Sequence, residues 1–261
     1  MSRAHRFASL FHFNRQLVCG IGCAVLMLGM ASTSRAELCV VPDTAGTAAL
    51  PPLGCEYTTP NGDMQIIDGL PAGTTIDIDA VLKDFFGVVS GAGGNLGGER
   101  ETYIGGLQLP MTGTGALFGF ERNMLMTVDT ITDSAVRTPN DAVQTFARDM
   151  FSMSGEVIGD PDFQTLEITA GTNLVAASPG STTLNRLGGI GSDWNVESFF
   201  DVAYAITYAG APGSNLQDYS GVSTGTVRFQ LGMPVPEPTS AMLCLVGLAT
   251  IGLGMCRRRD A

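Results

Sequence analysis

Apolar and polar residues alternate over several stretches in the middle of this 261-residue chain. The longest stretch is FFDVAYAITY, residues 199–208, in which every second residue is large and apolar: Phe200, Val202, Tyr204, Ile206 and Tyr208. Because successive side chains of a strand point to opposite faces, this period of two predicts a strand with one buried face. The same alternation predicts strands at 74–82, 163–170 and 226–231, and further candidates lie near 101–112, 117–130, 151–158 and 181–187.

Clusters of Gly, Pro, Asp and Ser separate these segments and predict turns, at 91–98, 159–161, 178–180, 188–191 and 212–214. Seven or more strands with turns at this spacing predict an all-β fold, either an antiparallel β-sandwich or a jelly roll. A body of about 200 residues suits one such domain.

The stretch DAVQTFARDMF, residues 141–151, is ambiguous. Its apolar residues Val143, Phe146, Ala147 and Met150 have helical spacing, and Asn140 is a possible N-cap. A short helix is therefore the alternative to a strand at this place.

The N-terminus has the three parts of a secretory signal peptide. Residues 1–16 carry three arginines and no acid, residues 17–30 are apolar or Gly, and small residues follow, with Ser34 and Ala36 at positions −3 and −1. This order predicts a signal peptide over residues 1–36 that signal peptidase cuts between Ala36 and Glu37. An uncleaved membrane anchor is the alternative, but the apolar run is short for a span.

The C-terminus carries a second apolar segment. Residues 239–256 contain no charge, and as a helix these 18 residues would be about 27 Å long, enough to cross the hydrocarbon core of a bilayer. Three arginines follow at once, and basic residues stay on the cytoplasmic side. This pattern predicts a single transmembrane helix with the body outside, whereas a buried core helix would not end in three arginines.

The whole tail resembles the PEP-CTERM sorting signal of exported bacterial proteins. The residues that carry the resemblance are Pro236, Glu237 and Pro238, the apolar segment 239–256, and Arg257, Arg258 and Arg259. The resemblance implies that an exosortase-type membrane protease processes the tail. It also implies transient anchoring in the inner membrane, then delivery to the cell surface or extracellular matrix, in bacteria that make exopolysaccharide and biofilm. A tail of this kind is also described as an ice-binding protein C-terminal domain, which implies no activity of the body.

These ends divide the chain into a signal peptide at 1–36, a body at 37–233 and a sorting tail at 234–261. The body contains 23 acidic and 7 basic residues, a net charge of −16, whereas the whole chain carries −11. Such a body repels nucleic acid and anionic membrane surfaces, so no nucleic-acid partner is expected. It could attract divalent cations.

The body contains two cysteines, Cys39 and Cys55. In an exported domain such a pair indicates one disulfide, which in the chain-entropy model stabilises the fold by roughly 3 kcal/mol. Two free thiols, or a bond to another chain, are the alternatives.

Both histidines, His5 and His12, lie in the signal peptide, so the body has none. This excludes Ser-His-Asp and Cys-His mechanisms and zinc sites that need imidazole. Lys83 is the one lysine of the body. Paired carboxylates can still hydrolyse glycosides, and a carboxylate-based glycan-active enzyme stays an alternative to the non-enzymatic protein that we expect.

Few segments of the body suggest a ligand site. The Gly-rich stretch GVVSGAGGNLGGER, residues 87–100, lacks the spacing of a phosphate loop and predicts a flexible hairpin. Carboxylates that could bind Ca²⁺ lie on a predicted strand and in a predicted turn, where a solvated face and local hydrogen bonds are the ordinary interpretations; they are Asp77, Asp79, Asp84, Asp160 and Asp162. No other cofactor is expected.

Threonines recur at 112–115 and 223–226 but form no array of the kind that ice- or carbohydrate-binding faces use, and β-propensity explains them. Trp194 and Tyr219 could stack on a sugar ring, although a single Trp is more often a core residue. The body is also similar to uncharacterised exported β-proteins through the phrases GTTIDIDA, RTPND, GDPDF, AGT and SFFDV, which implies a shared fold. We therefore expect an exported surface or matrix protein, with a polysaccharide- or Ca²⁺-binding module as the alternative; exopolysaccharide is a candidate partner.

Overall fold

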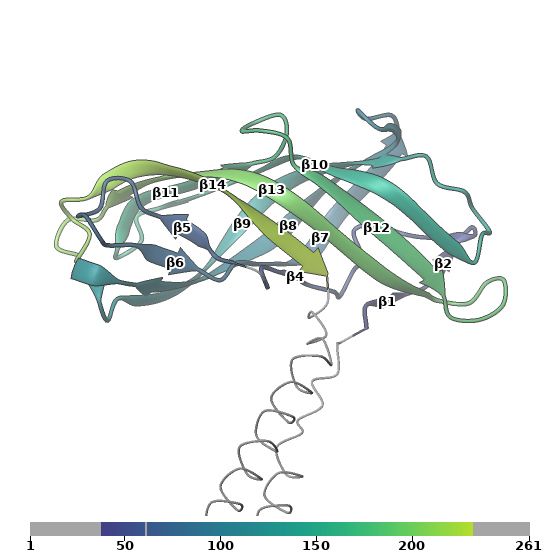
Figure 1. The fold of residues 1–261 in the computed structure, drawn as a ribbon, viewed down its shortest axis with the longest axis horizontal. Helices are drawn as coiled ribbons and strands as arrows, with labels where there is room; N and C mark the ends of the chain where they lie inside the picture. Colours follow the sequence, from purple (N-terminus) through teal and green to yellow (C-terminus); the bar gives the residue numbers. More distant parts are fainter. Residues whose placement is uncertain (1–37, 61, 232–261) are drawn as a thin grey trace, which may run out of the picture. The chain divides into compact units, whose positions relative to one another are not determined.

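The computed structural model of the protein describes residues 38–60 and 62–231, which form almost the whole predicted body (Figure 1). The predicted cleavage site Ala36–Glu37 and the sorting residues Pro236–Pro238 and Arg257–Arg259 lie outside the described residues. Within the described part of the chain, no helix has the length and apolar character to span a membrane.

The described residues form an all-β, antiparallel fold, as the alternation predicts, with one short 3₁₀ turn, η1 (Gly115–Leu117). The strands are β1 (Val40–Val41), β2 (Asp43–Thr44), β3 (Thr47–Ala48), β4 (Tyr57–Thr58), β5 (Met64–Ile66), β6 (Ile76–Ile78), β7 (Val81–Ala92), β8 (Gly97–Gly113), β9 (Glu121–Ala135), β10 (Val143–Ile158), β11 (Phe163–Ala170), β12 (Pro179–Arg186), β13 (Trp194–Gly210) and β14 (Ser220–Leu231).

Twelve of these strands belong to one sheet whose pairings return to their starting point. From β8 the path runs through β9 to β10, which pairs β12 along its first half and β11 along its second half. Both β11 and β12 pair with β13, and β14 follows. The two-residue strand β4 then joins β14 to β7, and β7 pairs with β8. A closed path of this kind lets one sheet enclose its own core.

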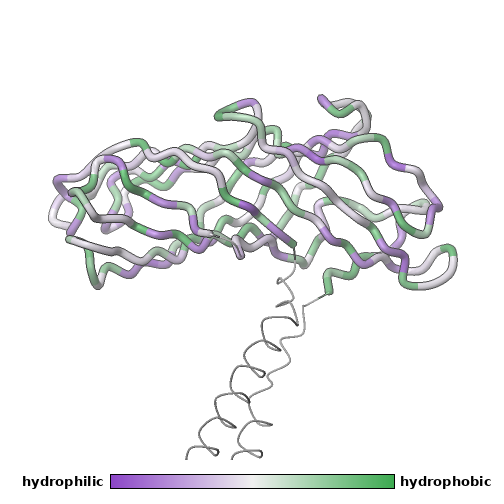
Figure 2. Tube along the Cα trace, viewed as in Figure 1, coloured by the Kyte–Doolittle hydropathy of each residue, from purple (hydrophilic) through white to green (hydrophobic). Residues whose placement is uncertain are grey.

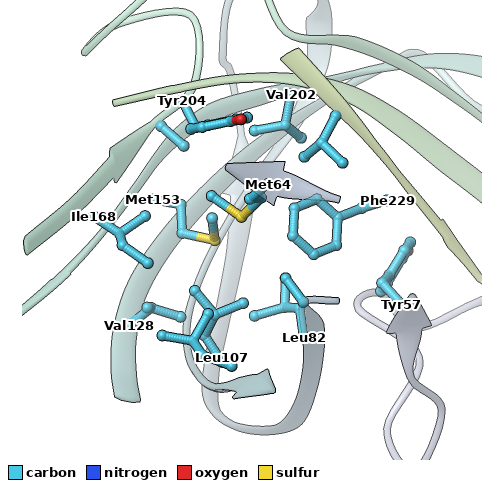
Figure 3. Close-up of a cluster of buried hydrophobic side chains, with 14 of the residues drawn as sticks. Tyr57, Met64, Leu82, Leu107, Val128, Met153, Ile168, Val202, Tyr204 and Phe229 are labelled. Atoms are coloured by element: carbon cyan, nitrogen blue, oxygen red, sulfur yellow. The ribbon is translucent and has the colours of Figure 1, made fainter. Parts of the chain in front are cut away.

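The core lies between two groups of strands (Figure 3). Side chains from β13 and β14 face those of β7, β8 and β9, with Met64 of β5 between them. The predicted inward residues of β13 are all buried, with exposed fractions of 0–4 % for Phe200, Val202, Tyr204, Ile206 and Tyr208. The alternation is visible along the strands in Figure 2. The period of two therefore identified the buried face of β13 correctly.

The helix considered for residues 141–151 is wrong, because this stretch forms the first part of β10. Val143 and Ala147 point outward, while the polar residues Gln144 and Arg148 are buried. Gln144 can be buried because its amide donates to the carbonyl of Gly46 at 2.7 Å and its oxygen accepts from Thr47 at 2.9 Å. The apparent helical spacing arose because polar residues occupy inward positions that the pattern assigns to apolar ones.

A disulfide joins Cys39 and Cys55 in the structure. Next to it, β1 pairs with the start of β13, where Val41 lies opposite Trp194. The indole N–H of Trp194 donates to Asp43 at 2.8 Å, and its ring is fully buried. The N-terminal segment is thus attached to β13 by backbone pairing and by the buried indole.

Candidate functional site

Loops from four connections gather at one end of the body (left in Figure 1). They are the segments 67–75, 114–120, 159–162 and 211–219. Backbone hydrogen bonds connect them, since Thr114 N–H donates to Thr75 at 2.9 Å and Ala211 N–H donates to Asp162 at 2.8 Å. Because loops carried by a rigid sheet commonly hold binding residues, this end is the first place to examine for a site.

A hollow of about 340 Å³ opens at this end, lined by residues 116–120, Asn215 and Tyr219. We call it the Phe118–Tyr219 hollow. Phe118 is 90 % exposed, whereas Tyr219 is half-buried and packs against the core. None of the lining side chains is charged. The hollow is therefore an uncharged surface between the 116–120 loop and the residues Asn215 and Tyr219.

The loop that carries Phe118 has a fixed backbone. Its successive turns are closed by hydrogen bonds from Leu117 to Thr114, from Phe118 to Gly115 and from Phe120 to Leu117, at 2.9–3.2 Å. Gly115 has a positive φ of 57°, and a Cβ there would lie 2.3 Å from the Gly73 carbonyl oxygen. Only glycine fits this approach without strain.

The Thr-rich stretch 112–115 has a structural role in this loop. The backbone N–H of Thr75 donates to the hydroxyl of Thr114 at 3.0 Å, and the N–H of Ala116 donates to the hydroxyl of Thr74 at 3.1 Å. These contacts connect the Phe118 loop to the start of β6 rather than presenting hydroxyls to a ligand.

The opposite wall, residues 211–219, is also held by local hydrogen bonds. Ser214 and Tyr219 donate backbone N–H bonds to Ala211 and Leu216, at 3.1 and 2.8 Å. Gly210, the last residue of β13, lies so close to this loop that a Cβ would be 1.7 Å from the Leu216 oxygen. The Asn215 side chain is exposed at the hollow, so its amide is open to solvent.

Behind the hollow lies an aromatic cluster. The ring of Phe120 is 6.5 Å from that of Phe163, which is 6.4 Å from that of Tyr208. The Tyr208 hydroxyl is buried and has no partner among the described residues. Burial, with Asp68 and Tyr219 nearby, raises the pKa of Tyr208 to about 12, so this hydroxyl stays protonated at neutral pH. The cluster packs Phe120, which lines the hollow, against β11 and β13.

A second polar group lies inside the core, where Arg148 of β10 pairs with Glu101 of β8 at 2.7 Å. Thr132 of β9 donates to the same carboxylate oxygen at 2.8 Å. Burial raises the pKa of Glu101, an effect that the charge of Arg148 opposes. Both side chains are only 1 % exposed, so neither can reach a substrate in this arrangement.

A pair of carboxylates also occurs on the outer face, where Asp133 of β9 lies opposite Asp149 of β10. Arg100 donates two bonds to Asp133, at 2.7 and 2.8 Å, and the hairpin residue Asn95 donates its N–H at 2.8 Å. Asp149 accepts from Thr172 at 2.5 Å, and burial raises its pKa. The Gly-rich stretch is indeed a hairpin, closed by a bond from Gly93 to Gly98. It covers Asp133, which is fully buried.

The five Ca²⁺ candidates do not converge on one site. In the described ranges, no group of three or more His, Cys, Asp or Glu side chains is placed to hold a metal ion. Asp77 accepts bonds from Gln65 and Thr75, at 2.9 and 3.2 Å, and Asp79 accepts from Thr59 at 3.3 Å. Asp84 is exposed on β7, in a hollow of about 350 Å³ that also contains Lys83.

The turn carboxylates Asp160 and Asp162 bind a cation of the protein itself, because both pair with Arg122. Asp160 also accepts the backbone N–H groups of Asp162 and Phe163, at 2.9 and 3.4 Å. Burial alone would raise the pKa of Asp160, but these hydrogen bonds outweigh it and lower the pKa.

The two aromatic candidates differ in outcome. Trp194 cannot stack on a sugar, because its ring is buried and lies 4.5 Å from the Arg186 guanidinium. Tyr219 lies in the hollow, beside Phe118 and Asn215, which the sequence pattern did not indicate. Phe118 and Asn215 are 97 residues apart in the sequence, and no local pattern indicated that they would line the same hollow.

The C-terminal residues 234–259 match the family model of the PEP-CTERM protein-sorting motif. No curated protein and no solved structure matches the chain. The match therefore concerns the tail, and the body has to be understood from its own residues.

Proposed function

We propose that this protein is exported, held briefly in the inner membrane, and then delivered to the cell surface or extracellular matrix, where it acts without catalysing a reaction. The observation that carries this proposal is the sorting motif at residues 234–259, since tails of this kind are processed by exosortase, a membrane protein. Signal peptidase would remove residues 1–36 and leave Glu37 as the first residue.

The charges of the body fit an exported protein that has no nucleic-acid or anionic-membrane partner. Six of its seven basic side chains form ion pairs with carboxylates; they are Lys83, Arg100, Arg122, Arg137, Arg148 and Arg228. Arg186 packs on Trp194 instead. Little positive charge is thus left to attract phosphate groups.

A non-enzymatic role is supported by the burial of the strongest polar groups. Glu101 and Arg148 are enclosed in the core, and the Asp133 carboxylate is covered and saturated with hydrogen bonds. A carboxylate-based glycan-active enzyme, the alternative, would have to use a pair such as Asp133 and Asp149 after an opening of the loops above them.

A binding module is the second candidate function. The Phe118–Tyr219 hollow supports polysaccharide as the ligand, because it is a concave surface without charged side chains. Ca²⁺ is less favoured, since Arg122 already occupies the carboxylates of the 159–162 turn.

The proposal is tested by mass spectrometry of the surface-exposed protein in a host that carries an exosortase, with a host lacking the protease as the control. We expect the surface species to begin at Glu37 and to lack Arg257–Arg259. A dominant surface species ending at Ala261 would show that the tail is a permanent anchor.

A further inference from the structure

Strand β7 has one edge that no neighbouring strand of the described body completes beyond its start. It pairs with β8 as far as Ala92, whereas on its other edge it pairs only with β4, at its first two residues. All residues from 86 to 97 are exposed, and a Cβ added at Gly87 or Gly91 would meet no atom within 4 Å. The outer part of β7 therefore presents unpaired backbone donors and acceptors along an open edge.

This edge lacks the features that usually prevent strands of different chains from pairing. Exposed edges commonly carry Lys, Pro or other charged residues, or are covered by another segment. Strand β14 has such a cover, because the N–H groups of Ile67 and Asp68 donate to its Ser223 at 2.8 and 2.9 Å. Residues 85–97, in contrast, contain no charged residue and no Pro, and Phe86 is 55 % exposed. The open edge of β7 is therefore suited to receive another strand.

The pairing with β8 identifies which backbone groups face the open edge. Residues 89–92 pair with β8 without a shift of register, and the N–H of Gly93 donates to the carbonyl of Gly98 at 2.9 Å. Along an antiparallel strand, successive residues direct their N–H and C=O groups to opposite edges. Ser90 and Ala92 therefore direct both groups away from β8, to the open edge.

From these features we infer that the open edge of β7 pairs antiparallel with β7 of a second copy of this chain and forms a twofold dimer. An antiparallel edge is its own complement: with the twofold axis at Gly91, Ser90 lies opposite Ala92 of the second copy, and the two residues exchange N–H···O bonds. Because the stretch is uncharged, no carboxylate of residues 85–97 meets another at the contact. The pairing completes both open edges, so the assembly ends at two chains.

The charge of the body predicts how this dimer responds to salt. Residues 37–233 carry a net charge of −16, so two bodies repel each other at long range although the contact itself is neutral. Added salt screens this repulsion and should strengthen the dimer. A contact with a basic partner would weaken in salt instead, so the sign of the salt effect distinguishes the two.

The test is sedimentation velocity of the full chain in a zwitterionic detergent, over a range of protein and salt concentrations. Ser90→Pro removes an N–H that faces the open edge and leaves the bonds between β7 and β8, since Pro is tolerated where the N–H points away from the sheet. Its dimer dissociation constant should be at least about tenfold higher than that of the wild type. Ser90→Thr is the matched control, because it keeps the N–H and should dimerise within about threefold of the wild type.

Hydrogen exchange of the wild type is the second measurement, and it is independent of whether Ser90→Pro folds. The amides of Ser90 and Ala92 should exchange slowly in concentrated samples and quickly in dilute ones. The inference is overturned if the wild type stays monomeric, if these amides exchange quickly at every concentration, or if salt weakens the dimer. A folded Ser90→Pro that associates as the wild type does would also overturn it and assign the association to another part of the chain.

Discussion

Arg148 and Glu101 form a buried ion pair across the sheet, with Nη2 of Arg148 2.7 Å from Oε2 of Glu101. Strand β9 lies between their strands and contributes Thr132, which donates to the same oxygen at 2.8 Å. Arg148 Nε and Nη1 and Glu101 Oε1 have no partner among the described residues. Few hydrogen bonds therefore stabilise these two buried charges. Each charge depends on the other for its compensation.

Replacing Arg148 with Met should lower the free energy of unfolding by about 3–5 kcal/mol, because it leaves a buried carboxylate without a counter-charge. Urea unfolding at neutral pH measures the loss. The double variant Arg148→Met with Glu101→Leu removes both charges and should recover most of it. A single variant as stable as the wild type would show that the pair contributes no net stability.

The stability should depend on pH through Asp133. Burial alone would raise its pKa, but the bonds from Arg100 and from the Asn95 N–H outweigh this effect and lower the pKa from its ordinary value. A lowered folded pKa gives stability that is present above the unfolded pKa and is lost as the pH falls through the folded pKa. The stability difference between wild type and Asp133→Asn should therefore be largest near neutral pH and should shrink in acid, as measured by urea unfolding at several pH values. A difference that stays constant down to strong acid would contradict this.

The cysteines should be bridged in the exported protein. Alkylation of a non-reduced sample should leave Cys39 and Cys55 unlabelled, and reduction before alkylation should label both. The double variant Cys39→Ala with Cys55→Ala should lose roughly 3 kcal/mol of unfolding free energy, because the open chain regains loop entropy. Full labelling without reduction would refute the bridge.

Gly210→Ala should disrupt the loop that carries Asn215 and Tyr219. The added Cβ would lie 1.7 Å from the Leu216 oxygen, so the loop must move, and overpacking of this kind costs about 1–3 kcal/mol or more. Gly189→Ala is the control, because a Cβ there meets no atom within 4 Å and φ is not in the left-handed region. Thermal unfolding should separate the two variants, and equal midpoints would disprove the close approach.

Two variants of the sorting tail should distinguish recognition by the protease from insertion into the membrane. Glu237→Ala should slow processing but leave membrane insertion unchanged, because the apolar segment 239–256 is intact. Replacing Arg257–Arg259 with Glu should disturb retention or orientation, since basic residues hold their end on the cytoplasmic side. Pulse-chase labelling with membrane fractionation measures both, and normal processing of Glu237→Ala would argue against recognition of the motif.

The sequence predicted the fold class because apolar side chains occupy alternate positions of the strands and face the core. This holds for β13, whose five large inward residues are buried, and for Ile76 and Ile78 of β6. It failed at residues 141–151, where Gln144 and Arg148 point inward. Their partners Gly46 and Glu101 are 98 and 47 residues away, so no local pattern could show that these polar groups are satisfied.

The candidate site was predictable only in part. Tyr219 was a candidate because aromatic rings can stack on sugars, and it does lie at the hollow. Trp194 was a candidate for the same reason and is instead buried against Asp43. Phe118 lies in the β8–β9 connection and Asn215 in the β13–β14 connection, and both line the hollow. That these two connections meet at one end of the sheet is a property of the topology, which no local pattern shows.

Strand β14 is bound unequally along its two edges. It pairs with β13 at eleven positions but with β4 at two, and the sorting tail begins three residues after its end in the sequence. A tension along the strand axis, applied at Leu231, would therefore be resisted by the β13–β14 ladder in shear, where many hydrogen bonds must break together. Force that enters the body at its C-terminal end is thus borne by the eleven-position pairing of β14 with β13, and the short β4 contact carries little of the load.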